Sequence, residues 1–140
     1  MTMESDLMRQ KLRVIPLFEE LPDESLDLVA ATAAEVEAAA GHVLAEAGQE
    51  GTGMFVLEEG KVAVELPDGR VKELGPGDFF GELSLLGAGV RVARVRATSP
   101  VRCLAIARRD FEKLLRAEPH IALAMLPVVA RRLAEVRADH

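Results

Sequence analysis

The sequence predicts a mainly β domain with flanking helices, in which an antiparallel β-roll (jelly roll) lies between two helical segments. Apolar residues recur at helical spacing near both ends of the chain. All 11 glycines fall between positions 41 and 89, where they separate short apolar segments. Short strands with regular turn signals are typical of antiparallel sandwiches and barrels. We expect residues 1–140 to form one domain, because a chain of this length is of ordinary single-domain size.

Residues 5–40 are expected to form the N-terminal helices. A first apolar pattern ends at Pro16, and a second one continues as far as Gly41. Asp23 stands where the N-cap of the second helix is expected. The apolar positions are Leu7, Met8, Leu12 and Ile15 in the first pattern, and Leu26, Val29, Ala30, Ala33 and Ala34 in the second.

Residues 41–107 are expected to form the β-roll. The sequence Pro67-Asp68-Gly69 is typical of a hairpin turn and lies between two short apolar segments. Residues 80–87 differ from their surroundings, because they are too short and too rich in leucine for a strand in this setting. They predict a short helix of about one and a half turns that Gly87 closes.

Residues 109–138 are expected to form the C-terminal helices. Asp110 could cap a short helix over Phe111–Ala117, and Pro119 interrupts the pattern. A longer helix follows from about His120, and Pro127 lies inside it. Its apolar stripe could pack on the core, cover a ligand, or form a dimer seam. We expect Arg131 and Arg132 of the same helix to be solvated unless one of them reaches a ligand. The stripe consists of Ile121, Met125, Val129, Leu133 and Val136.

Composition excludes several classes of function. The net charge of −6 argues against a free-standing nucleic-acid binder, whose surface would be basic. The charge is uneven: residues 1–60 hold 13 acidic and 3 basic residues, and residues 61–140 hold 10 acidic and 14 basic ones. An anion would therefore meet the second half of the chain, although two solvated faces of opposite sign explain the same numbers.

The single cysteine, Cys103, rules out a disulfide framework and a cysteine-based metal site, and we expect it to be a buried structural thiol. No apolar run approaches 18 residues, and the N-terminus lacks the apolar stretch of a signal peptide. We therefore expect a cytoplasmic protein without a membrane partner.

The stretch from Phe80 to Ala97 carries the candidate chemistry. Strand alternation places Arg91 on the same face as Ala93, Val95 and Ala97, which is the better candidate for the interior. A guanidinium at the mouth of a roll needs an anion. Glu82 could be that partner, or both side chains could await a ligand. The first N–H groups of a short helix after Gly81 suit a phosphate, and a carboxylate accepts hydrogen bonds from a sugar hydroxyl, so the combination suggests a nucleotide.

This stretch resembles the phosphate-binding cassette of the cyclic-nucleotide-binding domains found in the catabolite activator protein and in the regulatory subunits of cAMP-dependent protein kinase. Their pattern Phe-Gly-Glu-Leu-(Ala/Ser)-Leu-Leu, followed after a spacer by Pro-Arg-x-Ala-(Thr/Ser)-Val-x-Ala, stands here as residues 80–86 and 91–97. Residues 17–21, 41–48, 54–62 and 74–82 resemble further signposts of the family, so the resemblance covers nearly the whole chain.

The resemblance implies a role for each residue of the cassette. Glu82 would accept the ribose 2′-hydroxyl with the Gly81 backbone beside it, Arg91 would pair with the cyclic phosphate, and the N–H groups of Ser84 and Ala93 would complete the cradle. The full predicted site is Gly81, Glu82, Leu83, Ser84, Arg91, Val92 and Ala93. Val90 replaces the usual proline. Val92 has no hydroxyl group, and because a threonine at this position favours guanine in the family, we expect cAMP rather than cGMP. Arg94 could be a solvated charge.

We therefore expect a regulatory module that binds cAMP or a related cyclic nucleotide without turning it over and repositions its C-terminal helix. It would use no cofactor and no metal, and it could form a homodimer through that helix. We expect it to bind no nucleic acid by itself, because the helix-turn-helix of the family's transcription factors does not follow.

One alternative is a protein-interaction scaffold whose pocket is vestigial or re-purposed, with Arg91 and Glu82 paired to each other. Another is a cupin-like metalloenzyme, which the three scattered histidines disfavour; we expect His42 to be a surface or turn residue.

Overall fold

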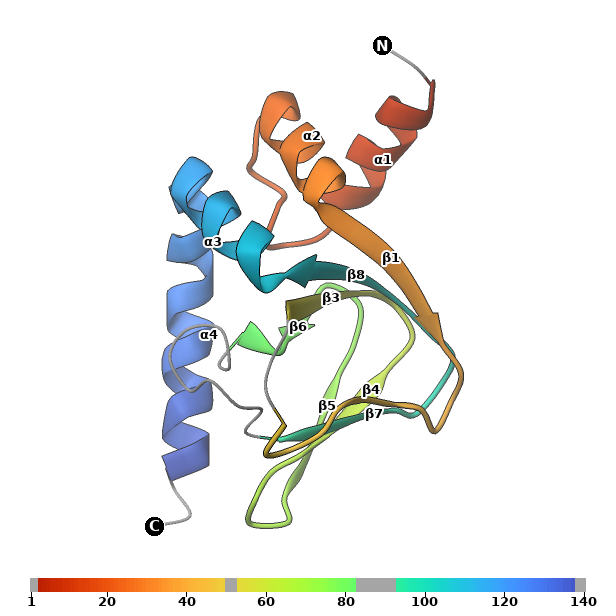
Figure 1. Ribbon diagram of the computed structural model, residues 1–140, viewed down its shortest axis with the longest axis vertical. Coiled ribbons are helices and arrows are strands. Elements are labelled where there is room, and N and C mark those ends of the chain that lie inside the picture. Colours follow the sequence, from red (N-terminus) through yellow and green to blue (C-terminus); the bar gives the residue numbers. More distant parts are fainter. Residues whose placement is uncertain (1–2, 50–52, 83–92, 138–140) are drawn as a thin grey trace.

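The computed structural model describes residues 3–49, 53–82 and 93–137, which form two four-stranded antiparallel sheets with helices packed to one side (Figure 1). This arrangement confirms the predicted mainly β class with flanking helices. The helices are α1 (Met3–Arg13), α2 (Asp23–Thr32), α3 (Arg108–Ala117) and α4 (Pro119–Arg137). The strands are β1 (Ala33–Ala38), β2 (Val43–Ala45), β3 (Gly53–Glu59), β4 (Val62–Glu65), β5 (Val71–Leu74), β6 (Phe79–Phe80), β7 (Arg94–Ala97) and β8 (Val101–Ala107). No helix in the described ranges is long and apolar enough to cross a membrane.

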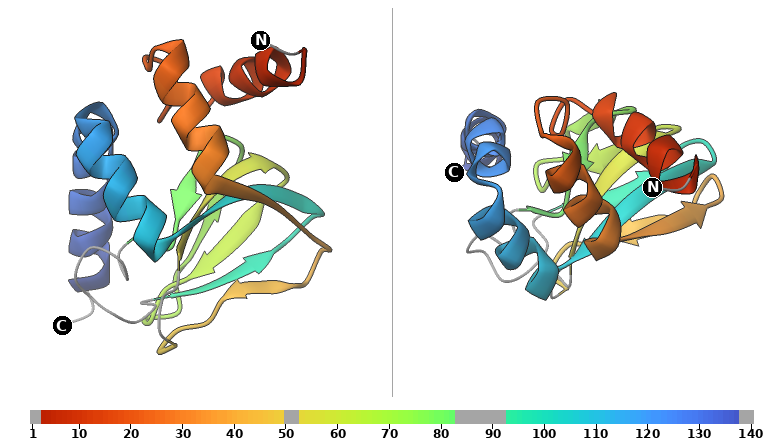
Figure 2. Two further views of the ribbon diagram at one scale, coloured as in Figure 1. Left: turned by 45° about the horizontal axis from the view of Figure 1, so that its top comes forward. Right: turned by 90° about the horizontal axis from the view of Figure 1, so that it is seen from above.

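The two sheets have the strand orders β1-β8-β3-β6 and β2-β7-β4-β5. One apolar cluster lies between them and includes Leu57, Val62, Phe80 and Val95. A second cluster lies between the first sheet and the helices, where Val56, Leu104 and Ile106 meet Phe18 and Leu26. Figure 2 shows α1 and α2 over the first sheet, and Figure 1 shows α4 running alongside the roll from the level of the first sheet to that of the sheet β2-β7-β4-β5. The helices are therefore held against the first sheet by burial of apolar side chains.

The N-terminal helical prediction extends too far. The helix α2 ends at Thr32, and residues 33–38 form strand β1 instead of continuing the helix toward Gly41. Every residue of β1 is in register with β8, from Ala33 opposite Ile106 to Ala38 opposite Val101. The backbone hydrogen bonds of that ladder override the helical propensity of an alanine-rich segment, whose single Val36 gives little sequence signal for a strand.

Both predicted N-caps are also wrong. Pro22 precedes α2 without a side-chain cap, and the Asp23 carboxylate instead accepts a 2.6 Å hydrogen bond from Arg13. The helix α3 begins at Arg108 after an extended Ala107, so that Asp110 lies inside its first turn. An acidic residue in the first turn still stabilises a helix through the macrodipole. Pro127 lies inside α4 as predicted.

Two predictions for the roll are confirmed. The turn Pro67-Asp68-Gly69 joins β4 to β5, and Gly69 has a φ of +90°. The alternation predicted for residues 93–97 is also present. Ala93, Val95 and Ala97 are buried, whereas Arg94 is exposed and Arg96 is half-buried.

Cys103 lies on β8 inside the cluster between the sheets and is fully buried. Burial raises the pKa of its thiol to about 11, and the negative charge of Glu58 acts in the same direction. A thiol that stays protonated at neutral pH is a poor nucleophile, so Cys103 packs as a small apolar group.

Two glycines with the same backbone conformation give a direct test of packing near the roll's edge. Gly60 and Gly69 have φ values of +88° and +90°. A Cβ at Gly60 would overlap the Pro100 carbonyl oxygen, whereas a Cβ at Gly69 would meet nothing within 4 Å. We expect Gly69→Ala to lower the free energy of unfolding by about 1–2 kcal/mol through backbone strain alone. We expect Gly60→Ala to lower it by at least about 3 kcal/mol, because overpacking adds to that strain. Urea denaturation measures both, and equal losses in the two variants would contradict the packing of Gly60 against Pro100.

Candidate functional site

The segment with Gly81 and Glu82 leaves the first sheet directly after β6. The two residues of β6 pair with β3, with Phe55 opposite Phe80 and Val56 opposite Phe79. The rings of Phe55 and Phe80 stack with centroids 5.0 Å apart, which fixes the end of the strand. Gly81 has a φ of +90°, a conformation that glycine adopts without steric cost. The chain therefore turns sharply at Gly81 and presents Glu82 at a defined place.

Glu82 is a buried charge with a partner on the C-terminal helix. The residue is only 2% exposed. The Nη1 group of Arg132 on α4 donates to both carboxylate oxygens at 2.7 Å, and the Arg132 side chain is 16% exposed. Removing a carboxylate from water is costly unless it is paired and hydrogen-bonded, and this ion pair provides both.

The Arg132 guanidinium also lies over the aromatic ring of Phe79. The Cζ atom of Arg132 lies 4.7 Å from the centroid of the Phe79 ring, within the range of a cation–π interaction. Phe79 itself is buried in the cluster between the sheet and the helices. The guanidinium of Arg132 thus bridges a core aromatic residue and the carboxylate that follows β6.

The expectation that Arg132 is solvated is wrong, although Arg131 is exposed as expected. Ile121 and Met125 of α4 are buried in the apolar core. Steps of four, three and four residues along the helix from Ile121 lead to Met125, Val128 and Arg132. Arg132 therefore continues the inward face of the helix. That spacing is the signal by which the sequence could have identified Arg132 as a partner of the roll.

The predicted site residues are placed unevenly. Gly81 and Glu82 lie after β6, and Ala93 is buried just before β7. Leu83, Ser84, Arg91 and Val92 lie outside the described residues, as do residues 83–87 of the short helix expected over 80–87. The suggested pairing of Glu82 with Arg91 also falls outside them. Phe80, the first residue of that expected helix, belongs to strand β6 instead, because it pairs with β3. Arg94 is exposed and forms ion pairs with Glu46 at 3.5 Å and Glu65 at 3.9 Å, as expected of a solvated charge.

A carboxylate held in this way accepts hydrogen bonds, and each of its oxygens has lone pairs beyond those that Arg132 uses. It is suited to binding a hydroxyl group of a ligand. Within the described residues, no group of three or more His, Cys, Asp or Glu side chains could hold a metal ion.

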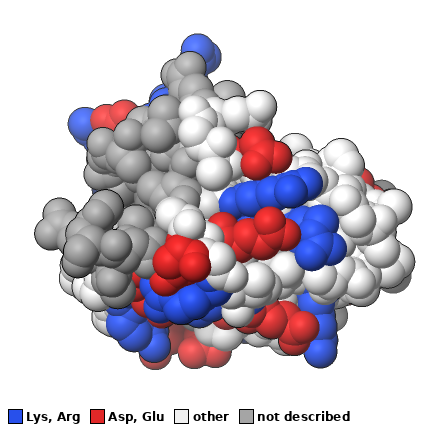
Figure 3. Space-filling view, turned by 90° about the horizontal axis from the view of Figure 1, so that it is seen from below, with Lys and Arg blue, Asp and Glu red and all other residues white. Residues whose placement is uncertain are grey.

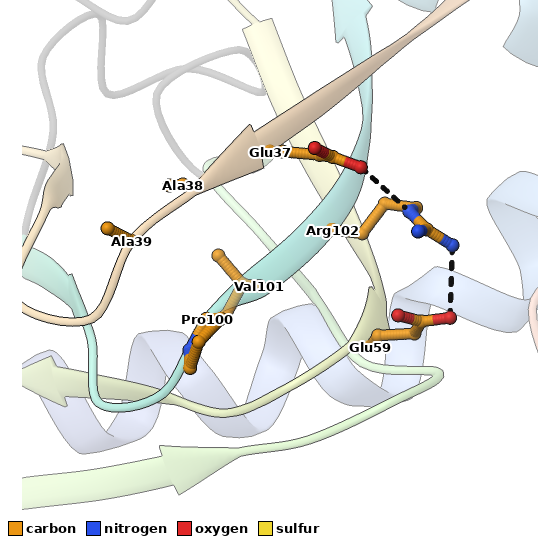
Figure 4. A pocket seen from close by; sticks show the side chains of 7 residues that line it. All are labelled: Glu37, Ala38, Ala39, Glu59, Pro100, Val101 and Arg102. Atoms are coloured by element: carbon orange, nitrogen blue, oxygen red, sulfur yellow. Dashed lines mark hydrogen bonds and ion pairs between the residues drawn. The ribbon is translucent and has the colours of Figure 1, made fainter.

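A hollow of about 390 Å³ lies elsewhere, between residues of β1, β3 and β8 (Figure 4). Its polar side chains are already joined, because Arg102 forms ion pairs with Glu37 at 3.4 Å and Glu59 at 3.0 Å. Glu82 does not line it. The hollow is therefore lined by paired charges and by small apolar residues, and it shares no residue with the predicted site.

The face below the roll carries charges of both signs side by side (Figure 3). Ion pairs on the sheet β2-β7-β4-β5 join Arg96 to Glu65 at 3.3 Å and Lys61 to Glu73 at 3.4 Å. On the described part of this face, acidic side chains therefore lie beside the basic ones and form ion pairs with them.

The chain is similar to known proteins over most of its length. A cyclic nucleotide-gated potassium channel of Rhizobium etli is 38% identical over 114 residues, which cover 81% of this chain and 32% of the channel. The chain therefore spans about a third of the length of that relative.

Solved structures agree with the fold. The catabolite activator protein of Thermus thermophilus is 32% identical with a TM-score of 0.75, and the match covers 89% of this chain and 61% of that one. The N-terminal domain of a transcriptional regulator from Streptomyces coelicolor A3(2) is 38% identical with a TM-score of 0.64, and the match covers 93% and 94% of the two chains.

The family model of the cyclic nucleotide-binding domain matches residues 35–118, from β1 to the turn after α3. That range includes the buried Glu82, the segment 80–97 and the whole roll apart from the first two residues of β1. Domains of this family are regulatory and typically non-catalytic. The chain therefore belongs to the cyclic nucleotide-binding domain family.

Proposed function

We propose that this domain binds cAMP in the segment 81–93 and acts by binding alone, without a catalytic step. In this proposal the Glu82 carboxylate accepts a hydrogen bond from the ribose 2′-hydroxyl, and Arg91 forms an ion pair with the cyclic phosphate. The backbone N–H groups of Ser84 and Ala93 complete the phosphate cradle. Gly81 allows close approach of the ligand, and Leu83 and Val92 line the remainder of the site.

The observation that carries the proposal is the buried carboxylate of Glu82 directly after β6. A glutamate that served only the fold would not need this place, because a well-packed apolar residue stabilises a core at least as well as a buried ion pair. The Arg132 nitrogen donates to both oxygens at 2.7 Å, and acceptor positions remain for a hydroxyl. This arrangement supports a role in recognising the sugar of the nucleotide.

The preference for cAMP over cGMP rests on Val92. In the family a threonine after the phosphate-binding arginine favours guanine, and a valine there offers no hydroxyl to the ligand. We therefore expect cAMP to bind more tightly than cGMP.

The output of the domain is a shift of α4 between two positions. The helix carries Arg132, and Arg132 contacts the proposed ribose-binding carboxylate. A ligand that changes the hydrogen bonding of Glu82 therefore changes the free energy of the α4 position, and such a difference is what moves a population between two states.

The outer face of α4 suits a second copy of the chain. Its inward residues Ile121 and Met125 are buried, yet Leu123 and Leu126 on another side are 61% and 59% exposed. A helix that is apolar on two sides generally has a partner on both. We propose a homodimer that packs these outer faces together.

We also propose that the protein is cytoplasmic. Its free, buried Cys103 is consistent with a reducing compartment.

The alternative of an interaction scaffold with a vestigial pocket is not favoured. The buried Glu82–Arg132 pair preserves the carboxylate that ribose recognition needs, and the family model covers nearly the whole roll.

Isothermal titration calorimetry with cAMP and cGMP tests the ligand. We expect saturable binding with cAMP the tighter of the two. Arg91→Ala should weaken cAMP binding at least 100-fold, since an unpaired buried phosphate charge costs about 3 kcal/mol. Arg94→Ala is the matched control, because its side chain points outward three residues later, and it should bind cAMP normally. A folded protein that takes up neither nucleotide at millimolar concentration would refute the proposal and favour the scaffold.

Analytical ultracentrifugation tests the dimer. We expect a reversible dimer that Leu126→Glu converts to a monomer, because the new charge would be buried in the interface. Leu7→Glu on α1 is the matched control, since Leu7 is 58% exposed and Leu126 is 59% exposed. A wild-type protein that remains monomeric at high concentration, or a Leu7→Glu variant that dissociates equally, would show that the outer face of α4 is not the interface.

A further inference from the structure

The last turns of α4 are held by polar contacts rather than by the core. Ile121 and Met125 belong to the apolar cluster, and Val128 and Val129 pack against its edge. Beyond Val129, no described side chain of α4 belongs to either apolar cluster. The next large apolar residue that the structure describes, Leu133, is 43% exposed. Something other than hydrophobic burial must therefore fix the position of the helix at Arg132.

A second ion pair lies one turn beyond Arg132. The Lys72 ammonium on β5 donates to both oxygens of Glu135, at 2.9 and 3.0 Å. The side chains of Lys72 and Glu135 are 42% and 29% exposed, so the pair is partly shielded from solvent. Residues 132 and 135 are three apart and therefore neighbours on the helix surface, which places both contacts on the side that faces the roll.

The hairpin between β4 and β5 also binds the helix backbone. The Nη2 group of Arg70 donates to the Glu135 carbonyl oxygen at 2.7 Å. The last four carbonyl groups of a helix lack partners within the helix, and a basic side chain there satisfies one of them and interacts favourably with the dipole. Arg70 is itself paired with Asp68 in the same turn, which orients the guanidinium.

The end of α4 is thus tied to two parts of the roll at once. Arg132 binds the carboxylate after β6, and Glu135 binds the hairpin of the other sheet. An ion pair that is rigidly placed at one point of a helix constrains its neighbours on the next turn, because the helix moves as a rigid rod over such a short length.

From these contacts we infer that Lys72 and Glu135 are positioning residues for the nucleotide site. The hairpin holds the last turns of α4, α4 holds Arg132, and Arg132 holds Glu82 in the orientation that accepts the ribose hydroxyl. The hairpin therefore sets how strongly the domain distinguishes a ribose from a 2′-deoxyribose. This inference rests on the proposed function, because it deepens the role given there to Glu82.

The experiment compares cAMP with 2′-deoxy-cAMP by calorimetry in four variants and the wild type. We expect the wild type to prefer cAMP by about 10- to 100-fold, the range for a hydrogen bond to a charged group. Lys72→Glu and Glu135→Lys should each reduce this preference by about 3- to 10-fold. The double variant Lys72→Glu/Glu135→Lys should restore most of it, since the exchange re-forms the pair with opposite polarity.

Lys61→Glu is the matched control. Lys61 forms a 3.4 Å ion pair with Glu73 of β5 but does not reach α4, so its reversal should leave the preference unchanged. Unchanged preferences in Lys72→Glu and Glu135→Lys, or an equal loss in Lys61→Glu, would overturn the inference.

Hydrogen exchange of the amides at 130–137 in the protein alone separates this inference from the proposed function. We expect faster exchange in Lys72→Glu and Glu135→Lys and near wild-type exchange in the double variant. Wild-type exchange in all of them would overturn the anchoring by the hairpin, whatever binds. A protein that binds neither nucleotide would overturn the ribose role together with the proposed function, while faster exchange would still support the anchoring.

Discussion

The buried carboxylate of Glu82 is the constraint around which the site is organised. A charge that is 2% exposed needs a partner, and the structure provides one from α4, 50 residues later in the chain. The Arg132 guanidinium forms that ion pair while it lies above the ring of Phe79. Removal of either member would leave the other buried and unpaired, which generally costs several kcal/mol. The ion pair therefore links the end of β6 to the C-terminal helix more strongly than an exposed pair could.

The remainder of the fold places these groups. The ladder between β3 and β6 and the left-handed turn at Gly81 direct Glu82 out of the sheet. Burial of Ile121 and Met125 directs the inward face of α4, and with it Arg132, toward the roll. The hairpin then fixes the far end of the helix through Glu135. Apolar packing sets the general position of α4, and polar contacts set its last turns. A change at the proposed ligand site would therefore act on the part of the helix that the core holds least.

Much of this arrangement could be predicted from the sequence, and the exceptions have physical reasons. The alternation of Ala93, Val95 and Ala97 with two arginines predicted β7 correctly, because period-two patterns depend only on local geometry. The strand β1 was missed because alanines favour a helix until a neighbouring strand competes for their backbone. The partner of Glu82 was missed because an arginine on a helix is usually solvated, and only the inward spacing of position 132 marks it as different.

A crystal structure of the protein with cAMP tests the role of Glu82 and α4 most directly. We expect the ribose 2′-oxygen to lie within hydrogen-bonding distance of the Glu82 carboxylate. We also expect Arg132 still to contact that carboxylate and Lys72 still to contact Glu135. A nucleotide bound with its ribose away from Glu82, or with Arg132 separated from Glu82, would contradict the claim that α4 takes part in recognising the sugar.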